Sequence, residues 1–248
     1  VPTLQVVNNS RLPLLLFDGE EVVGGRQNRV VNTTVLVPGQ ATFDLDVTCV
    51  EHGRWYEAAP EFKTGEAVYP TLRGQKARQV AASLAASAGP RADQGVVWDE
   101  VANRQYAAHT IAPTNALHDL YLQRDAELVD AVRQFSVPED AVGVIATLNG
   151  RARCADLFDR PSTLQAYWSR LVRSYALEAS GPGVRSDTAL GSAIRLLSRA
   201  ERAERQAFPS AGLGSDVRLS GSGITGAALT HAGVVVHTAV FRQVLDLL

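Results

Sequence analysis

The chain has 248 residues, of which 46% are apolar and 20% charged, with 20 Gly, 11 Pro and two Cys. A chain of this length and composition buries enough surface to fold without disulfides, and disorder, collagen and coiled coil are excluded. The formal net charge of -2 makes nucleic acid a poor partner, because no excess of positive charge attracts a polyanion.

The first sixty residues are predicted to form β-strands. An apolar run over 12–17 ends in the turn pair Asp18–Gly19, and a Val- and Thr-rich run covers 29–37 before Pro38–Gly39. Residues 41–50 alternate between apolar and polar, which predicts a half-buried strand. The apolar face of this strand carries Ala41, Phe43, Leu45, Val47 and Cys49.

The middle of the chain is predicted to be helical and then to return to β-structure. Helices are expected over 75–88, over 93–106 and in one longer amphipathic segment from Pro113 to Phe135. Apolar runs at 142–148 and 151–158 flank Asn149-Gly150, a strong hairpin signal.

Two further helices and a closing β-region follow. Helices are predicted over 161–179 and 186–207, and strands over 217–219, 224–229 and 234–241. The order lacks a regular βα alternation, so the expected class is α+β: antiparallel or mixed β-sheet elements with two helical segments packed on them. No long polar linker divides the chain, and residues 1–248 are expected to form a single domain.

Generic motifs carry little functional information here. Residues 221–226 match GxGxxG, but a strand rather than a helix is predicted to follow, so a turn is favoured over a dinucleotide site. The five His lack metal-ligand spacing, and His237 is interpreted as an ordinary strand residue. Cys49 and Cys154 are far apart, without a CxxC motif, which favours a reducing compartment, and Cys49 is interpreted as a core residue rather than a nucleophile.

Two N-terminal blocks, 18–29 and 49–57, concentrate carboxylates, arginines, amides and glycines beside apolar strands. The alternation of strand 41–50, carried past Cys49, places Glu51 on the core side, where a carboxylate needs a partner. Arg29 and Arg54 are the natural candidates. One interpretation is a buried Glu–Arg pair that fixes strand register, and the other is a cleft in which arginines and glycine-rich backbone hold a phosphate or carboxylate.

The same residues resemble the ARPP domain family, whose name stands for ADP-ribosylglycohydrolase- and rhodanese-phosphatase-superfamily-associated protein. The likeness rests on Gly19-Glu20-Glu21, on Gln27-Asn28-Arg29 and on the segment Cys49 to Trp55. It continues in weaker matches through the chain, including Gln94, Trp98-Asp99-Glu100, Pro113-Thr114, Asp156-Leu157-Phe158-Asp159, Trp168 and His237. His52 departs from the Gln expected there, which puts a role for that side chain in doubt.

By association, the resemblance implies a role with NAD-derived or phosphorylated sugar nucleotides. The first hypothesis is an enzyme in which Glu51 or Glu20 is the general acid or base. Its ligand-binding residues would be Gln27, Asn28, Arg29, Arg54 and Trp55. The second hypothesis is a non-catalytic sensor or scaffold domain that binds the same ligands and works with ADP-ribose- or phosphate-handling enzymes.

The expected partner is therefore a small phosphorylated molecule, with homo-oligomerisation left open. Neither a membrane-spanning run nor a signal peptide is found, and we expect a cytoplasmic, bacterial protein. No metal site or cofactor is predicted, although Glu20, Glu21 and Glu51 are oxygen donors of the kind that Mg²⁺ accepts. The chain contains no Met, even at position 1, which suggests a trimmed start and leaves open whether residues precede Val1.

Overall fold

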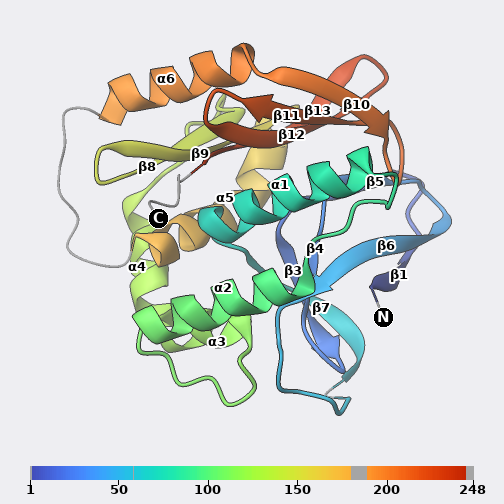
Figure 1. The fold of residues 1–248 in the computed structure, drawn as a ribbon, viewed down its shortest axis with the longest axis vertical. Coiled ribbons are helices and arrows are strands. Elements are labelled where there is room, and N and C mark those ends of the chain that lie inside the picture. The colour runs from blue at the N-terminus through green and yellow to red at the C-terminus, as the bar shows by residue number, and fades with distance from the viewer. Residues whose placement is uncertain (1, 58, 180–188, 244–248) are drawn as a thin grey trace.

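The computed structural model describes residues 2–57, 59–179 and 189–243 (Figure 1). Over these residues the chain forms six helices and thirteen strands in three antiparallel sheets. The α+β class and the antiparallel sheets agree with the expectation, but the expected two helical segments are wrong, because the described residues form six helices. The physical reason is that helices fill three separate positions: between the two large sheets, on the outer face of one of them, and beside the other.

The first sheet has five strands in the spatial order β1-β6-β4-β3-β7. Its strands are β1 (Thr3–Asn8), β6 (Ala41–Cys49), β4 (Arg29–Val31), β3 (Glu20–Gly25) and β7 (Ala59–Ala67). A separate two-stranded ribbon joins β2 (Leu14–Leu16) to β5 (Val35–Val37).

The predicted strand over 29–37 is divided into β4 and β5, which belong to different sheets. The chain leaves the ladder after Val31 because polar side chains in the connection bond elsewhere. Asn32 Nδ2 donates to the Pro90 carbonyl oxygen (3.0 Å), and the Thr34 hydroxyl contacts His237 Nδ1 (2.7 Å).

The second sheet has six strands in the spatial order β10-β11-β12-β13-β9-β8. These are β10 (Glu204–Pro209), β11 (Ser215–Gly221), β12 (Ile224–His231), β13 (Val234–Arg242), β9 (Arg151–Phe158) and β8 (Gly143–Leu148). The Asn149-Gly150 hairpin is confirmed, with both residues at positive φ (50° and 73°). Ser222 and Gly223 form the turn from β11 to β12, so the GxGxxG segment contains a turn, as predicted, and not a dinucleotide-binding loop before a helix.

The helices are arranged in layers around the sheets. They are α1 (Pro70–Ala85), α2 (Gln94–Ala107), α3 (Leu117–Gln123), α4 (Asp125–Gln134), α5 (Pro161–Glu178) and α6 (Ala189–Glu201). Figure 1 shows α1 and α5 between the second sheet and the first, α6 on the far side of the second sheet, and α2 and α3 beside the first sheet.

Two of the helix predictions are corrected by the structure. The single helix expected from Pro113 to Phe135 is two helices, because the chain departs from helical geometry at Arg124 (φ -113°, ψ 14°). The helix expected over 186–207 ends at Glu201, and residues 204–207 belong to β10; residues 186–188 lie outside the described residues. Pairing with β11 overrides the helical preference of this Glu-Arg-Gln-Ala segment.

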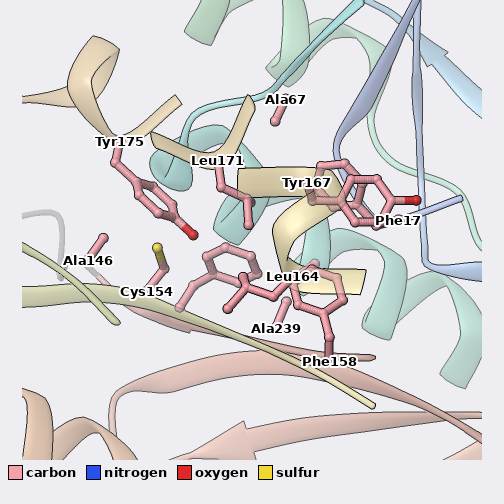
Figure 2. Packing of buried hydrophobic residues seen from close by; sticks show 12 residues of the cluster. Phe17, Ala67, Ala146, Cys154, Phe158, Leu164, Tyr167, Leu171, Tyr175 and Ala239 are labelled. Atoms are coloured by element: carbon pink, nitrogen blue, oxygen red, sulfur yellow. The ribbon is translucent and has the colours of Figure 1, made fainter. Parts of the chain in front are cut away.

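One apolar cluster joins the ribbon, α5 and the second sheet. Phe17 and Tyr167 pack with ring centroids 4.7 Å apart, and Phe158 and Tyr167 stack at 5.5 Å. Figure 2 shows Phe17 and Tyr167 side by side in this cluster, with Cys154 and Tyr175 directed toward each other. A second cluster packs α1, α2 and α3 against the first sheet, so both sheets share helix α1 as a common support.

Candidate functional site

The two N-terminal blocks meet at one end of the first sheet. Arg29 at the start of β4 pairs with Cys49 at the end of β6, and the Val50 amide donates to the Asn28 carbonyl oxygen (3.0 Å). The β3–β4 turn and the segment after β6 therefore lie side by side. Cys49 is buried, and its thiol donates to the Glu51 carbonyl oxygen (3.0 Å), as suits a core residue.

Glu51 is 4% exposed and forms a bidentate ion pair with Arg54. Arg54 Nε donates to Oε1 (2.8 Å) and Nη2 to Oε2 (2.7 Å), while the Thr114 hydroxyl and the Asn28 amide donate to the same two oxygens (2.8 and 3.0 Å). Burial raises the pKa of Glu51, but these hydrogen bonds outweigh it, so the pKa lies below its ordinary value. An ionised carboxylate with this set of donors favours the structural interpretation over an acid–base role.

The Arg54 guanidinium holds the β3–β4 turn in place. It donates to the carbonyl oxygens of Gly25 (2.6 Å), Gly24 (3.3 Å) and Tyr56 (3.4 Å), and to Asn28 Oδ1 (3.1 Å). Asn28 Oδ1 also accepts from the Gly24 amide (3.2 Å). The polar atoms of Asn28 and Arg54 thus bind the chain itself, and the ligand-binding role of these two residues stays a prediction.

Glu20 lies at the opposite end of β3 from the turn, so the structure does not bring Glu20 and Glu51 together. Its Oε1 accepts from Arg170 Nη1 on α5 (2.6 Å), and its Oε2 accepts from the Phe17 amide (3.3 Å). The catalytic role of both carboxylates stays a prediction.

A hollow of about 290 Å³ lies beside the Glu51–Arg54 pair, between the first sheet and the start of α2. We call it the tryptophan hollow. Its lining includes Gln27, Arg29 and Trp55 from the predicted ligand-binding residues, and adds Arg91, Gln94 and Trp98.

Helix α2 is fixed at this hollow by Gln94. Its Oε1 accepts from the Cys49 amide (2.9 Å), and its Nε2 donates to the Cys49 carbonyl oxygen (2.7 Å). The side chain therefore continues the backbone ladder of β6 and anchors the first turn of α2. One turn later, Trp98 lies against His52, with ring centroids 4.2 Å apart.

Three nitrogen atoms of the lining residues are buried without a hydrogen-bond partner among the described residues: Gln27 Nε2, Arg29 Nε and Trp98 Nε1. Arg29 Nη1 donates to Gln27 Oε1 (3.1 Å), which holds the two side chains together. Buried donors in folded proteins normally have an acceptor. Three side chains that line one hollow therefore keep donors without an acceptor, which favours a ligand that is rich in hydrogen-bond acceptors.

The hollow also has an aromatic and a charged rim. Trp55 is 70% exposed, an unusual position for so large an apolar ring. Arg91 is exposed and forms no ion pair with any described residue, although its charge offsets part of the rise that burial causes in the pKa of Asp46. An exposed indole beside a free guanidinium suits a ligand that has both a ring and an anionic group.

A buried ionic network between α1 and the second sheet was not anticipated from the sequence. Arg73 and Asp156 are both fully buried and form a bidentate pair (Nη1–Oδ2 3.0 Å, Nη2–Oδ1 2.7 Å). The Tyr175 hydroxyl donates to Asp156 Oδ2 (2.7 Å), and His237 Nε2 lies 3.3 Å from Oδ1. Burial raises the pKa of Asp156, but the charge of Arg73 and bonds from His237 and Arg73 hold it well below its ordinary value.

The same network continues through Lys76 to the ribbon side of the core. Lys76 Nζ is buried and donates to Asp18 Oδ1 (3.2 Å) and to the Val31 carbonyl oxygen (2.6 Å). The signal that could have revealed the network is the helical spacing of Leu72, Arg73, Lys76, Ala77 and Val80, all of which are buried. It is hidden when the helix is predicted to begin at Gln75.

Glu21, which was expected only as an oxygen donor of the kind that Mg²⁺ accepts, is fully buried beneath Gly65 of β7. Its Oε2 contacts His118 Nδ1 (2.9 Å) and accepts from the Glu66 amide (3.3 Å), while its Oε1 has no partner among the described residues. Burial raises the pKa of Glu21 despite the bond to His118. Glu21 thus has the raised pKa that a general acid needs, but it lacks exposure to solvent.

The acidic side chains do not assemble into a metal centre within the described part of the chain. Glu20, Glu21 and Glu51 bond to different partners, and no three His, Cys, Asp or Glu side chains of residues 2–57, 59–179 and 189–243 converge on one point. Among the same residues, every helix is too short or too polar to cross a lipid bilayer.

Comparison with known proteins agrees with the resemblance carried by the N-terminal blocks. A family model described as the ARG and Rhodanese-Phosphatase-superfamily-associated Protein domain matches residues 1–241. No curated protein and no solved structure matches the chain. Because the match spans nearly the whole sequence, the chain belongs to the ARPP-1 family.

Proposed function

We propose that this chain binds a phosphorylated ribose compound of the ADP-ribose class in the tryptophan hollow. In this proposal Arg29, Gln27 and Arg91 contact phosphate or ribose oxygens, and Trp55 covers an aromatic base. Glu51 and Arg54 do not contact the ligand but position its binding residues, because they hold the β3–β4 turn that carries Gln27 and Arg29.

The observation that carries the proposal is that Gln27, Arg29 and Trp98, which line the hollow, each keep a buried donor without a partner among the described residues. A buried polar group that lacks a hydrogen bond costs about 1–3 kcal/mol. Phosphate and ribose supply many acceptor oxygens in a small volume, and guanidinium groups bind phosphate with charge-assisted hydrogen bonds. A ligand of this class therefore fits the chemistry of the lining better than an apolar one.

The size of the hollow limits what it can enclose. Its volume of about 290 Å³ is close to the lower end of ligand pockets, which run from about 300 to 1,000 Å³. We therefore propose that it encloses a phosphorylated ribose, while the base lies over the exposed ring of Trp55. The family name, which associates these proteins with ADP-ribosylglycohydrolase- and rhodanese-phosphatase-type enzymes, supports the same ligand class.

A thermal-shift screen with ADP-ribose, AMP, ribose 5-phosphate and inorganic phosphate tests the proposal. A ligand that binds the folded state raises the melting temperature by mass action. We expect ADP-ribose and AMP to raise it most, and the rise to disappear in Arg29→Gln. Arg26→Gln is the matched control, because Arg26 is an exposed neighbour that does not line the hollow.

Loss of the rise in both variants would assign it to general charge, and no rise with any of the four compounds would contradict the proposal. Glu51→Gln, assayed for consumption of each bound compound, addresses the catalytic hypothesis separately. Turnover by the wild type that Glu51→Gln abolishes while binding persists would restore Glu51 as a catalytic residue. A single domain over 1–248, homo-oligomerisation and a cytoplasmic location remain predictions.

A further inference from the structure

A second hollow, of about 340 Å³, lies where α6 packs on β9 at the outer face of the second sheet (Figure 1). Four of its lining residues are arginines: Arg151, Arg195, Arg199 and Arg242. We call it the arginine hollow. An adjoining hollow of about 300 Å³ shares Arg242 and adds Arg78 and Arg153, together with the carboxylates of Glu100 and Glu178.

The local structure explains why the guanidinium groups gather there. Ser192 Oγ accepts from the Ala152 amide (2.9 Å), and Leu196 is buried against the second sheet, so this face of α6 is fixed on β9. Arg195 and Arg199 are four residues apart and therefore project from the same side of the helix. Arg151 begins β9, and Arg242 ends β13, the strand that pairs with β9.

Arg151 and Arg195 are exposed and Arg199 and Arg242 are half-buried, and within the described residues they differ from the buried arginines by lacking partners. Among the described residues, none of the four donates a side-chain hydrogen bond or forms an ion pair, whereas Arg54 and Arg73 pair with buried carboxylates. In the adjoining hollow, Arg153 Nε is buried without a hydrogen-bond acceptor.

The positive charges are close enough to act on one another. Burial lowers the pKa of Arg242, and repulsion from Arg151, Arg199, Arg153 and Arg195 lowers it further. Repulsion of this kind destabilises the folded chain unless an anion lies among the guanidinium groups. Among the described residues that line the arginine hollow, no carboxylate offsets these charges.

We propose that the arginine hollow binds a short polyphosphate chain, either as an inorganic di- or triphosphate or as the phosphate tail of a nucleotide. Guanidinium forks match phosphate oxygens in pairs, and linked phosphates present several such oxygens in a row. The described residues of the lining include no aromatic ring that could stack a base, so the phosphate chain itself is the recognised group. This site is independent of the tryptophan hollow.

Calorimetric titration of the full chain with tripolyphosphate, pyrophosphate, ATP and citrate tests this inference. We expect tripolyphosphate to bind more tightly than pyrophosphate, and the double variant Arg195→Gln/Arg199→Gln to weaken it by about tenfold or more for each arginine removed. Equal affinities for tripolyphosphate and ATP would identify the phosphate chain as sufficient, and tighter binding of ATP would identify a nucleotide as the source.

The control is Arg202→Gln/Arg205→Gln, which removes the same charge from exposed positions just beyond α6. It is expected to bind tripolyphosphate within about twofold of the wild type, since these guanidinium groups lie outside the hollow. The titrations are repeated in the Arg29→Gln background, so that phosphate bound in the tryptophan hollow does not contribute to the result.

The folded state of the double variant is checked by thermal unfolding without anion. Its melting temperature should equal or exceed that of the wild type, because two repelling charges are gone. Undiminished tripolyphosphate binding by this variant would overturn the inference. Absence of binding by the wild type, or citrate binding as tight as tripolyphosphate, would overturn it as well.

Discussion

The arginines near Glu51 are of two kinds, and Arg54 and Arg29 are an example of each. Arg54 is buried, pairs with Glu51 and donates to the carbonyl oxygens of the turn behind it. Arg29, on the neighbouring strand, bonds to Gln27 but keeps a buried Nε without a partner beside a hollow. In the sequence, both arginines were equivalent candidates for the partner of Glu51. In the structure they differ in whether their N–H groups are bonded to the chain.

The difference indicates how a charged residue should be assigned a role. A guanidinium whose donors bond to the chain stabilises the fold, and its loss appears in the free energy of unfolding. A guanidinium with an unpartnered donor beside a hollow is available to a ligand, and its loss appears in affinity. Each substitution below changes one kind of arginine, or its surroundings, and is measured as a change in unfolding free energy, in affinity, or in both.

The largest effect is expected for Arg73→Met. The change leaves Asp156 as an unpaired charge in the core, which costs about 3–5 kcal/mol of unfolding free energy. Denaturant unfolding measures this cost. Adding Asp156→Asn should restore part of the loss, because the orphaned charge is then removed. A cost below about 1 kcal/mol would show that the pair has little structural role.

A smaller, pH-dependent cost is expected for Glu51→Gln. Removing hydrogen bonds to a buried charge costs about 2–3 kcal/mol at neutral pH. Because the folded pKa of Glu51 is lowered, the unfolded chain binds its proton more readily, and stability from this group rises with pH. The cost should be complete above about pH 5 and shrink as the pH falls below about 4.3.

Unfolding of the two proteins at a series of pH values checks this sign. Glu57→Gln, at an exposed position in the same block, is the matched control and should change stability by no more than about 0.5 kcal/mol. A cost for Glu51→Gln that stays constant down to about pH 3 would mean that Glu51 is not ionised in the folded protein.

Trp55→Ala should leave the unfolding free energy nearly unchanged, since the ring is exposed, but weaken ligands that carry a base. Loss of a stacking surface is worth about 1–3 kcal/mol per base. AMP should therefore lose affinity while ribose 5-phosphate does not, as measured by calorimetry. Equal losses for both compounds would place the ribose phosphate, rather than the base, against Trp55.

The smallest effect is expected for Arg91→Gln. This guanidinium is on the exposed rim, so its contribution is screened by salt and should be about 0.5–1 kcal/mol of binding free energy. The salt dependence of AMP affinity should become shallower in the variant. An unchanged salt dependence would remove Arg91 from the proposed site.

The parts of the fold that could be predicted from the sequence are those that depend on local patterns of residues. The alternation over 41–50 and the Asn149-Gly150 turn each depend on neighbouring residues, and both are found in the structure. The Glu51–Arg54 pair could be named as a candidate for the same reason, because its members are three positions apart just after a regular strand.

Other parts depend on contacts that no local pattern reveals. Strands β3 and β7 were missed because Gly24, Gly25 and register shifts interrupt their alternation. Arg73 and Asp156 are 83 residues apart in sequence, so their pairing follows from how α1 packs on the second sheet. The sequence predicted part of the lining of the tryptophan hollow. Arg91 and Trp98 were missed, since they reach the hollow through the packing of α2 on β6.

The most direct test of the proposed ligand site is a calorimetric titration of ADP-ribose into the wild type and into Arg29→Gln, with unfolding free energies measured on the same samples. We expect saturable binding by the wild type, at least a tenfold weaker affinity in the variant, and unfolding free energies that agree within about 0.5 kcal/mol. Equal affinity in the two proteins, or a variant that loses stability instead of affinity, would contradict the assignment of Arg29 to a ligand.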